Sequence, residues 1–373
     1  MARDGFKIMD SDLHVLEPAD LWEQYIDPEF RDRAPRGLTE IRRGLGVVVE
    51  GQTCGQQAEG IPRIRRDYLT GLQHEHYAEI EARNYDGVGM LGAMDREGLD
   101  LAVLFPSRGL IIASIPGLDP ELFAAISRAY NDWLHDLCLS DPARMYGAAM
   151  VPPTAVDASV REARRCAEDY RFKAIFLAAD VYEGRGWDDP IYYPLWEECQ
   201  HQRLAVGFHT TGATTLRPGQ AGGMFTTWMQ QHTFTHAVPC MEAIAAFAAG
   251  GVLEEFPALK VAFLEANCSW APWLLWRLDE HYELGGHLER TQLKMKPSEY
   301  FRRQCYVSIE ADEDSARGIE AFGLDDNIVF STDFPHPDSK WPFAVESALE
   351  LPVSEQLKRK FLWENCQTLY SLF

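Results

Sequence analysis

The sequence predicts a single α/β domain, a (β/α)8 TIM barrel that occupies residues 1–373 and carries a long insertion after its first strand. Two observations predict this fold. Short apolar runs rich in β-branched and aromatic residues alternate with longer segments of helical periodicity, and eight such runs are found. A chain of 373 residues with 46% hydrophobic content is also long enough to bury the core of one such barrel.

The first expected strand, Phe6–His14, is an apolar run that ends in alternating polar residues. The other seven are Leu101–Phe105, Met145–Val151, Phe172–Ala178, Leu204–His209, Leu259–Glu265, Cys305–Glu310 and Asn327–Asp333. Parallel strands need long crossover connections, which are usually helices. The expected helices are Pro120–Leu139, Val156–Tyr170, Pro190–Gln202, Met241–Phe256 and Ser315–Phe322, and Pro257 and Gly323 stop the last two.

The connection after the first strand, at about residues 18–82, is far longer than a usual barrel loop. It is rich in charge and contains the arginine cluster Arg63–Arg66, so we expect an insertion that covers the barrel mouth or contacts a partner subunit. Such a cluster is typical of a solvated or subunit-contact surface, although guanidinium groups also suit a carboxylated substrate. The segment Thr210–Thr235, which contains several glycines and threonines, is expected to form a lid.

Charge and cysteine content exclude several classes of function. The formal net charge is −22 and the basic residues form no stripe, so we expect no binding to nucleic acid or to an anionic membrane surface. No apolar run approaches the roughly 20 residues that span a bilayer. Eight cysteines without a C-x-x-C pair, and an N-terminus without a signal pattern, predict a cytoplasmic protein. The insertion and the apolar segment Lys360–Phe373 favour a homodimer.

Four polar residues stand where expected strands end. Asp12 and His14 are two positions apart on the first strand and therefore point to one face of it. His209 and Asp333 end the fifth and eighth expected strands. Strand ends meet at the mouth of a barrel, where carboxylate and imidazole groups can bind a divalent cation. The sequence therefore predicts a metal site at Asp12, His14, His209 and Asp333.

Each of these residues also has a plainer explanation. Asp12 suits a turn, His209 suits a hydrogen-bonded core histidine, and Asp333 suits a turn or helix cap before Pro335. The spacing of His14 from Asp12 and the strand-end positions favour the metal site.

Three further segments of the sequence contain groups of residues that are typical of a known protein family. They are Ser331-Thr-Asp333-Phe-Pro-His336-Pro-Asp338, the stretch from Gly250 to Glu265, and Trp270-Ala-Pro-Trp-Leu-Leu-Trp-Arg277-Leu-Asp279. Together with Asp12, His14 and His209 they resemble the amidohydrolase superfamily, in the branch of aminocarboxymuconate semialdehyde decarboxylase, over nearly the whole chain. The resemblance implies a TIM barrel with a ligand pair on strand 1, a strand 5 histidine and a strand 8 aspartate. Asp12 replaces the commoner histidine or glutamate of the pair.

The chain departs from this resemblance at Glu265, because decarboxylases of the branch usually have a catalytic histidine at the end of strand 6. An imidazole can transfer a proton to a ring carbon, whereas a carboxylate beside a cation acts as a ligand or a base. With Glu17 and His236, Glu265 also enlarges the ligand set enough for a second metal. The alternatives are that Glu265 hydrogen-bonds a ligand or Arg277, that His236 caps a helix, and that Glu17 orients a basic residue of the insertion.

The leading prediction is therefore hydrolysis of a small carboxylated or aromatic substrate by metal-activated water. Asp333, Glu265 and His236 are the expected catalytic residues, and His336, Asp338 and Arg277 are expected behind the ligands or facing the substrate. Zinc, manganese and iron all suit such mixed donors, with one or two ions per chain.

Three other functions compete with hydrolysis. The runner-up is nonoxidative decarboxylation of an aromatic or unsaturated acid. A dinuclear iron or manganese enzyme with oxygenase or thioesterase-like chemistry and a noncatalytic scaffold are the remaining readings. The helical spacing of Trp270, Trp273 and Trp276 predicts that these rings pack a helix against the barrel.

Overall fold

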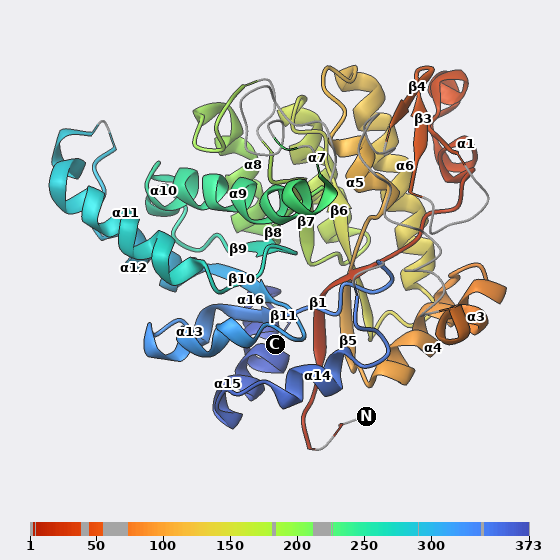
Figure 1. Cartoon of the computed structure of the whole chain (residues 1–373). Helices are drawn as coiled ribbons and strands as arrows, with labels where there is room; N and C mark the ends of the chain where they lie inside the picture. Colours follow the sequence, from red (N-terminus) through yellow and green to blue (C-terminus); the bar gives the residue numbers. More distant parts are fainter. Residues whose placement is uncertain are drawn as a thin grey trace.

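Eight parallel strands form a nearly closed barrel with helices around it in the computed structural model (Figure 1). The structure describes Arg3 and residues 5–38, 45–54, 74–180, 184–211, 225, 227–289, 291–336 and 339–372. In sheet order the strands are β1 (Met9–His14), β5 (Leu101–Phe105), β6 (Met145–Met150), β7 (Ala174–Ala178), β8 (Ala205–His209), β9 (Val261–Leu264), β10 (Cys305–Ile309) and β11 (Ile328–Phe330). The predicted fold is confirmed, and each strand lies within its predicted range.

Side chains join the two ends of the sheet, where β11 meets β1. The Ser11 hydroxyl donates to the carbonyl of Phe330 at 2.6 Å, and the Ser331 hydroxyl donates to the carbonyl of Asp12 at 3.1 Å. Thr332 donates its backbone N–H, at 3.2 Å, and its hydroxyl to the carboxylate of Asp10. These bonds hold the segment after β11 beside the end of β1, and so bring two distant parts of the sequence to the same place.

The helices differ from prediction mainly in their bounds. The first two predicted helices are α6 (Pro120–Cys138) and α7 (Val156–Glu168), and α8 (Tyr193–Gln202) follows a 3-10 turn. The segment predicted as Met241–Phe256 consists of α9 (Trp228–Ala248) and α10 (Val252–Glu255), because Gly251 lies between them at a φ of +95°. The last predicted helix is a 3-10 turn at Asp314–Arg317 followed by α13 (Gly318–Ala321).

The insertion after β1 contains a small sheet of its own. It consists of α1 (Leu21–Tyr25), a 3-10 helix at Pro28–Arg33, the antiparallel strands β2 (Arg36–Gly37), β3 (Val47–Val49) and β4 (Gln52–Cys54), and α3 (His74–Ala82). Buried Val47 and Val49 show that this sheet packs on the molecule. The arginine cluster Arg63–Arg66 lies outside the described residues, as does most of the predicted lid.

The remaining helices complete the outer layer. They are α4 (Gly87–Glu97), α5 (Arg108–Ala113), α11 (Ala271–Gly285), α12 (Pro297–Gln304), α14 (Ala344–Glu350), α15 (Glu355–Arg359) and α16 (Asn365–Leu369). Phe361, Leu362, Leu369 and Tyr370 are fully buried near β1 and β11. The apolar residues of the last segment therefore pack within the chain and do not support the predicted dimer.

Two further expectations concern surfaces and thiols. The prediction that the α11 tryptophans pack against the barrel is wrong for two of them, since Trp273 is 57% exposed and Trp276 is 48% exposed. Helical spacing identified one face of α11 but not what lies against it.

All eight cysteines are free thiols. Within the described part of the chain, every helix is too short or too polar to cross a membrane.

A buried glutamate at the end of α4 gives the fold a testable pH dependence. Glu97 accepts a hydrogen bond from the N–H of Val345 at 2.7 Å, but its second carboxylate oxygen is buried without a hydrogen-bond partner. Burial raises the pKa of Glu97 from 4.5 to about 7, although the N–H donors of α14 and the charge of Arg3 oppose this shift. The folded protein therefore holds this proton more tightly than the unfolded chain does, and this contribution to stability falls as pH rises from about 4.5 to about 7.

We expect Glu97→Gln to stabilise the protein by about 2–3 kcal/mol at pH 8, because glutamine keeps the acceptor for Val345 and removes the buried charge. At pH 4.5 the gain should vanish. Urea unfolding across this range measures the difference from wild type, with exposed Glu289→Gln as the control. An equal effect of Glu97→Gln at both pH values would contradict the assignment.

Candidate metal centre

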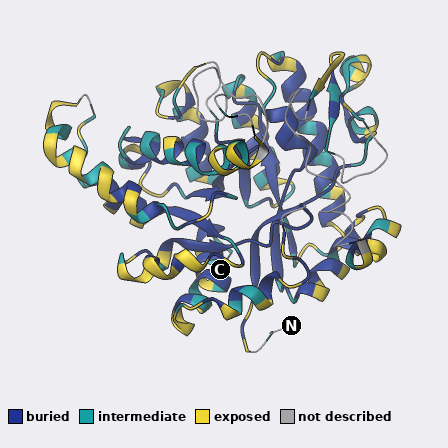
Figure 2. Cartoon of the chain, in the orientation of Figure 1, coloured by how far each residue is buried: buried dark blue, intermediate teal, exposed yellow. Residues whose placement is uncertain are grey.

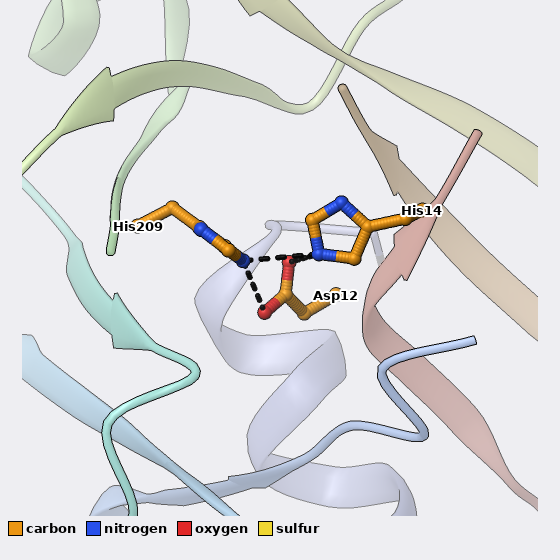
Figure 3. A group of neighbouring side chains, drawn as sticks. All are labelled: Asp12, His14 and His209. Carbon is orange, nitrogen blue, oxygen red and sulfur yellow. Dashed lines mark hydrogen bonds and ion pairs between the residues drawn. The ribbon is translucent and has the colours of Figure 1, made fainter. Parts of the chain in front are cut away.

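Three of the four predicted ligands converge at the carboxyl ends of β1 and β8 (Figure 3). Asp12, His14 and His209 are all fully buried. The Nε2 atoms of the two histidines lie 3.0 Å apart, and the Asp12 carboxylate oxygens lie 3.6 Å from His14 Nε2 and 3.4 Å from His209 Nε2. Residues 195 positions apart in the sequence therefore point their donor atoms at one another.

The hydrogen bonds of the two rings fix which nitrogen faces the group. His14 donates from Nδ1 to the carbonyl of Pro106 at 2.8 Å, and His209 donates from Nδ1 to the carbonyl of Thr210. A carbonyl oxygen can only accept, so each neutral ring presents the lone pair of Nε2. Two lone pairs at 3.0 Å repel unless a proton or a metal ion lies between them.

Asp12 gives a second indication. Both of its carboxylate oxygens are buried, and neither has a hydrogen-bond partner among the described residues. Unpartnered buried carboxylate oxygens are costly. Two imidazole nitrogens and a carboxylate are a donor set that suits zinc, manganese or iron, and carbonyl groups that orient the far sides of the rings are typical around such ions. These residues therefore fit a divalent cation.

Asp333 lies beside this group, as the sequence predicts. Its Oδ1 atom is 3.5 Å from His14 Nε2, and the residue follows β11 in a left-handed conformation with a φ of +53°. His336 donates from Nδ1 to the same oxygen at 2.8 Å and stacks on the His14 ring at 4.1 Å. His14, Asp333 and His336 can form a second metal-binding group, whose ligand atoms lie within 4.8 Å of one another. Asp338 lies outside the described residues.

Ser107 is a site residue that the sequence analysis missed. Its hydroxyl lies 3.0 Å from Nε2 of His336, and the side chain is fully buried. The bond completes a chain of contacts from Ser107 through His336 to Asp333. The signal was weak, because a lone serine after a strand is common, although its place just beyond the carboxyl end of β5 matches that of the ligands.

Glu265 and His236 form a pair next to His209. Glu265 follows β9 and places Oε2 3.5 Å from Nε2 of His209 and Oε1 3.3 Å from Nε2 of His236. His236 donates from Nδ1 to the carbonyl of His232 at 2.7 Å. Both ring nitrogens of His236 thus face oxygen acceptors, which favours the doubly protonated, positively charged ring. The pair is almost buried, with side-chain exposures of 11% for His236 and 12% for Glu265.

We had expected His236 at the start of a helix, but it does not lie there. Helix α9 begins at Trp228, where Thr227 caps it by accepting from the N–H of Gln230, and it continues through Pro239. His236 is therefore in the body of the helix, one turn after His232. The alternative of a capping role for His236 is wrong, and its side chain faces Glu265 instead.

Two predicted residues make no described hydrogen bond or ion pair with the metal-binding group. The carboxylate of Glu17 is fully buried and accepts from the backbone N–H groups of Ser107, Arg108 and Gly109 at 2.8–3.3 Å. Both Glu17 oxygens therefore bind the start of α5, rather than a basic side chain of the insertion. Arg277 is exposed on α11, and no described hydrogen bond or ion pair joins it to the metal-binding residues.

The electrostatics of the site favour a positive charge. Burial disfavours the charged form of His209, but the carboxylates of Asp12 and Glu265 outweigh it and raise the pKa of His209 to about 9. Burial, helped by the charges of His336 and His209, keeps the pKa of His14 well below its usual value. Burial raises the pKa of Asp12. For Glu265, the neighbouring histidines, His236 first, outweigh burial and lower the pKa.

Residues 70–372 match a family model described as amidohydrolase, which covers well over half of the chain. The chain belongs to the amidohydrolase family. Two curated relatives place it in the predicted branch. One is 2-amino-3-carboxymuconate-6-semialdehyde decarboxylase of Dictyostelium discoideum, 23% identical over 71% of each chain. The other is gamma-resorcylate decarboxylase of Polaromonas sp. strain JS666, 25% identical over 75% of this chain and 85% of the relative.

Solved structures show the same fold. An amidohydrolase from Mycobacterium avium subsp. paratuberculosis K-10 superposes with a TM-score of 0.76 at 18% identity, over 98% of this chain and 99% of that one. A 5-carboxyvanillate decarboxylase from Novosphingobium aromaticivorans gives 0.71 at 19% identity, over 99% and 97%. That enzyme was solved with manganese and 4-hydroxy-3-methoxy-5-nitrobenzoic acid. At these identities the likeness shows the fold alone. The family match and the curated relatives are what identify the chain as an enzyme of the amidohydrolase superfamily.

Proposed function

We propose that this amidohydrolase catalyses the metal-dependent, nonoxidative decarboxylation of an aromatic or unsaturated carboxylic acid. Hydrolysis led the sequence analysis because Glu265 stands where decarboxylases of the branch usually have a histidine. The observation that carries the proposal is the contact of His236 with Glu265. This contact brings an imidazole from helix α9 to the end of β9, the sixth strand of the barrel, beside the carboxylate of Glu265. The curated relatives, both named as decarboxylases, support the same reading.

Asp12, His14, His209 and Asp333 would hold the divalent cation. When bound, it supplies positive charge that attracts the substrate carboxylate and an adjacent oxygen atom. Manganese is the first metal to test, because a structural neighbour contains it. His336 and Ser107 orient Asp333 through the hydrogen bonds described above.

Decarboxylation replaces a carbon–carboxylate bond with a carbon–hydrogen bond, so each turnover releases one CO2 and consumes one proton at carbon. His236 can donate this proton, because Glu265 stabilises its charged ring. After donation, the neutral ring regains a proton from solvent through the 11% of its side chain that is exposed. The pair therefore acts as a proton donor that solvent reprotonates after each turnover.

The surroundings of the ligands also suit loss of a carboxylate. His209 lies among aromatic rings, with centroid distances of 6.2 Å to Phe105 and 6.5 Å to Phe176. Both rings are buried, so water has little access on this side. A substrate carboxylate held there exchanges its hydration for protein contacts, and the reaction removes its charge by releasing neutral CO2.

Hydrolysis remains the second candidate because Glu265 is also close to His209. A carboxylate in that place can accept a proton from attacking water. A dinuclear centre has less support, since both Glu17 oxygens are bound by backbone N–H groups and the two metal-binding groups share His14. A noncatalytic scaffold has no need for a buried carboxylate such as that of Asp12, whose oxygens accept no hydrogen bond from the described residues.

The deciding experiment is an assay of the manganese-loaded protein on hydroxybenzoates, unsaturated carboxylates, and matched esters, lactones and amides. Decarboxylation predicts CO2 and a product lacking one carboxylate, with no turnover of the esters. Hydrolysis of an ester, lactone or amide without any CO2 release would overturn the proposal in favour of the second candidate.

A further inference from the structure

Helix α11 and the turn after it carry large apolar side chains on their solvent side. Trp273 is 57% exposed, Trp276 48%, Leu284 79% and Leu288 80%. The helix projects from the body of the barrel, and much of its surface is exposed (Figures 1 and 2). Leu274 and Leu275, which face the protein, are buried, so the exposed residues form a separate face. Trp273 and Trp276 are neighbours on the helix surface, and adjacent exposed aromatic side chains are typical of interaction surfaces.

Along this face, apolar and charged side chains follow one another in a definite order. At about 100° per residue, Trp273, Arg277, Glu280 and Leu284 fall within an arc of about 60°. Arg277 and Glu280 are exposed, and the side chain of neither makes a hydrogen bond or ion pair among the described residues. The stripe therefore has an apolar residue at each end and two opposite, unpaired charges in the middle.

We propose that this α11 stripe binds the same stripe of a second copy of the chain, with the two helices antiparallel about a two-fold axis. An axis between Leu278 and Asp279 brings Trp273 of each copy opposite Leu284 of the other. It also brings Arg277 of each copy opposite Glu280 of the other. Each pair occurs twice, as a self-complementary two-fold interface requires.

The charges select this arrangement. A parallel pairing would place Arg277 against Arg277 and Glu280 against Glu280. Asp279 does not disturb the antiparallel pairing, because its carboxylate accepts from the N–H and the hydroxyl of Ser298 at 2.9 and 2.6 Å within its own chain. Two chains of net charge −22 repel each other, so local complementarity is needed for them to associate. The same charge disfavours an anionic lipid surface as the occupant.

Charge reversal tests the proposal, with self-association measured by sedimentation equilibrium on the full chain. Arg277→Glu and Glu280→Arg should each raise the dissociation constant about tenfold or more, because like charges then face each other twice. The double variant should return to within about threefold of wild type. Leu284→Glu should leave a monomer. Val88→Glu, at a 55% exposed residue of α4, is the control and should leave association unchanged.

Circular dichroism checks that every variant is folded, which the exposure of the replaced residues favours. A monomeric wild type at all concentrations would overturn the proposal. So would a dimer that both single reversals leave intact. Weakening by the single reversals without repair in the double variant would overturn the antiparallel register.

Discussion

Asp12→Asn will weaken the binding of divalent metal by more than about a hundredfold and abolish turnover. The carboxylate of Asp12 places one oxygen 3.6 Å from Nε2 of His14 and the other 3.4 Å from Nε2 of His209. An amide keeps its shape but lacks the charge that offsets a cation. Titration calorimetry with Mn²⁺ measures the loss, and the exposed Asp157→Asn is the matched control.

The same experiment has a pH dependence whose sign follows from His209. In the metal-free protein its pKa is raised to about 9, so at pH 7 the ring carries an extra proton. Metal must displace that proton. We therefore expect about one proton to be released per metal bound at pH 7, and an apparent affinity that rises about tenfold per pH unit up to about pH 9. Calorimetry in buffers of different ionisation enthalpy counts the protons.

Tight metal binding by Asp12→Asn would contradict the ligand assignment. Unchanged affinity between pH 6 and pH 9 would instead contradict the protonated state of His209. The two outcomes separate the role of Asp12 as a ligand from its electrostatic effect on the neighbouring ring.

Most of the candidate metal centre could be located from the sequence because the residues expected to bind the metal stand at strand ends. Asp12, His14, His209 and Asp333 each follow a short apolar run, and in a parallel barrel all strand ends meet at one rim. Local composition therefore sufficed to place residues that are hundreds of positions apart.

What could not be predicted depends on contacts that leave no pattern in the sequence. The start of α9 lies in a segment without apolar periodicity, so the position of His236 opposite Glu265 was not visible. Glu17 is bound by backbone N–H groups, which every residue except proline has. Trp273 has the spacing of a core residue and is exposed, because periodicity assigns a face to a helix but does not identify its neighbour.

His236→Gln will retain metal and lose catalysis. Its side chain contacts Glu265, and it is not one of the four residues expected to hold the metal, so the cation should bind with wild-type affinity. Glutamine can hydrogen-bond to Glu265 but cannot donate a proton to carbon. We expect kcat for decarboxylation to fall by about 10²–10⁴-fold, the usual contribution of a general acid.

The matched control is His201→Gln, at an exposed histidine of α8. It leaves His236 with its contacts to Glu265 and His232 in place, so catalysis should stay within about twofold of wild type. Glu265→Gln should resemble His236→Gln in rate, because the ring then lacks the carboxylate that stabilises its charge. Metal content by elemental analysis distinguishes the two roles of Glu265: loss of metal in Glu265→Gln would make it a ligand, and full occupancy would leave it as the partner of His236. Full decarboxylase activity in His236→Gln would remove this residue as the proton donor.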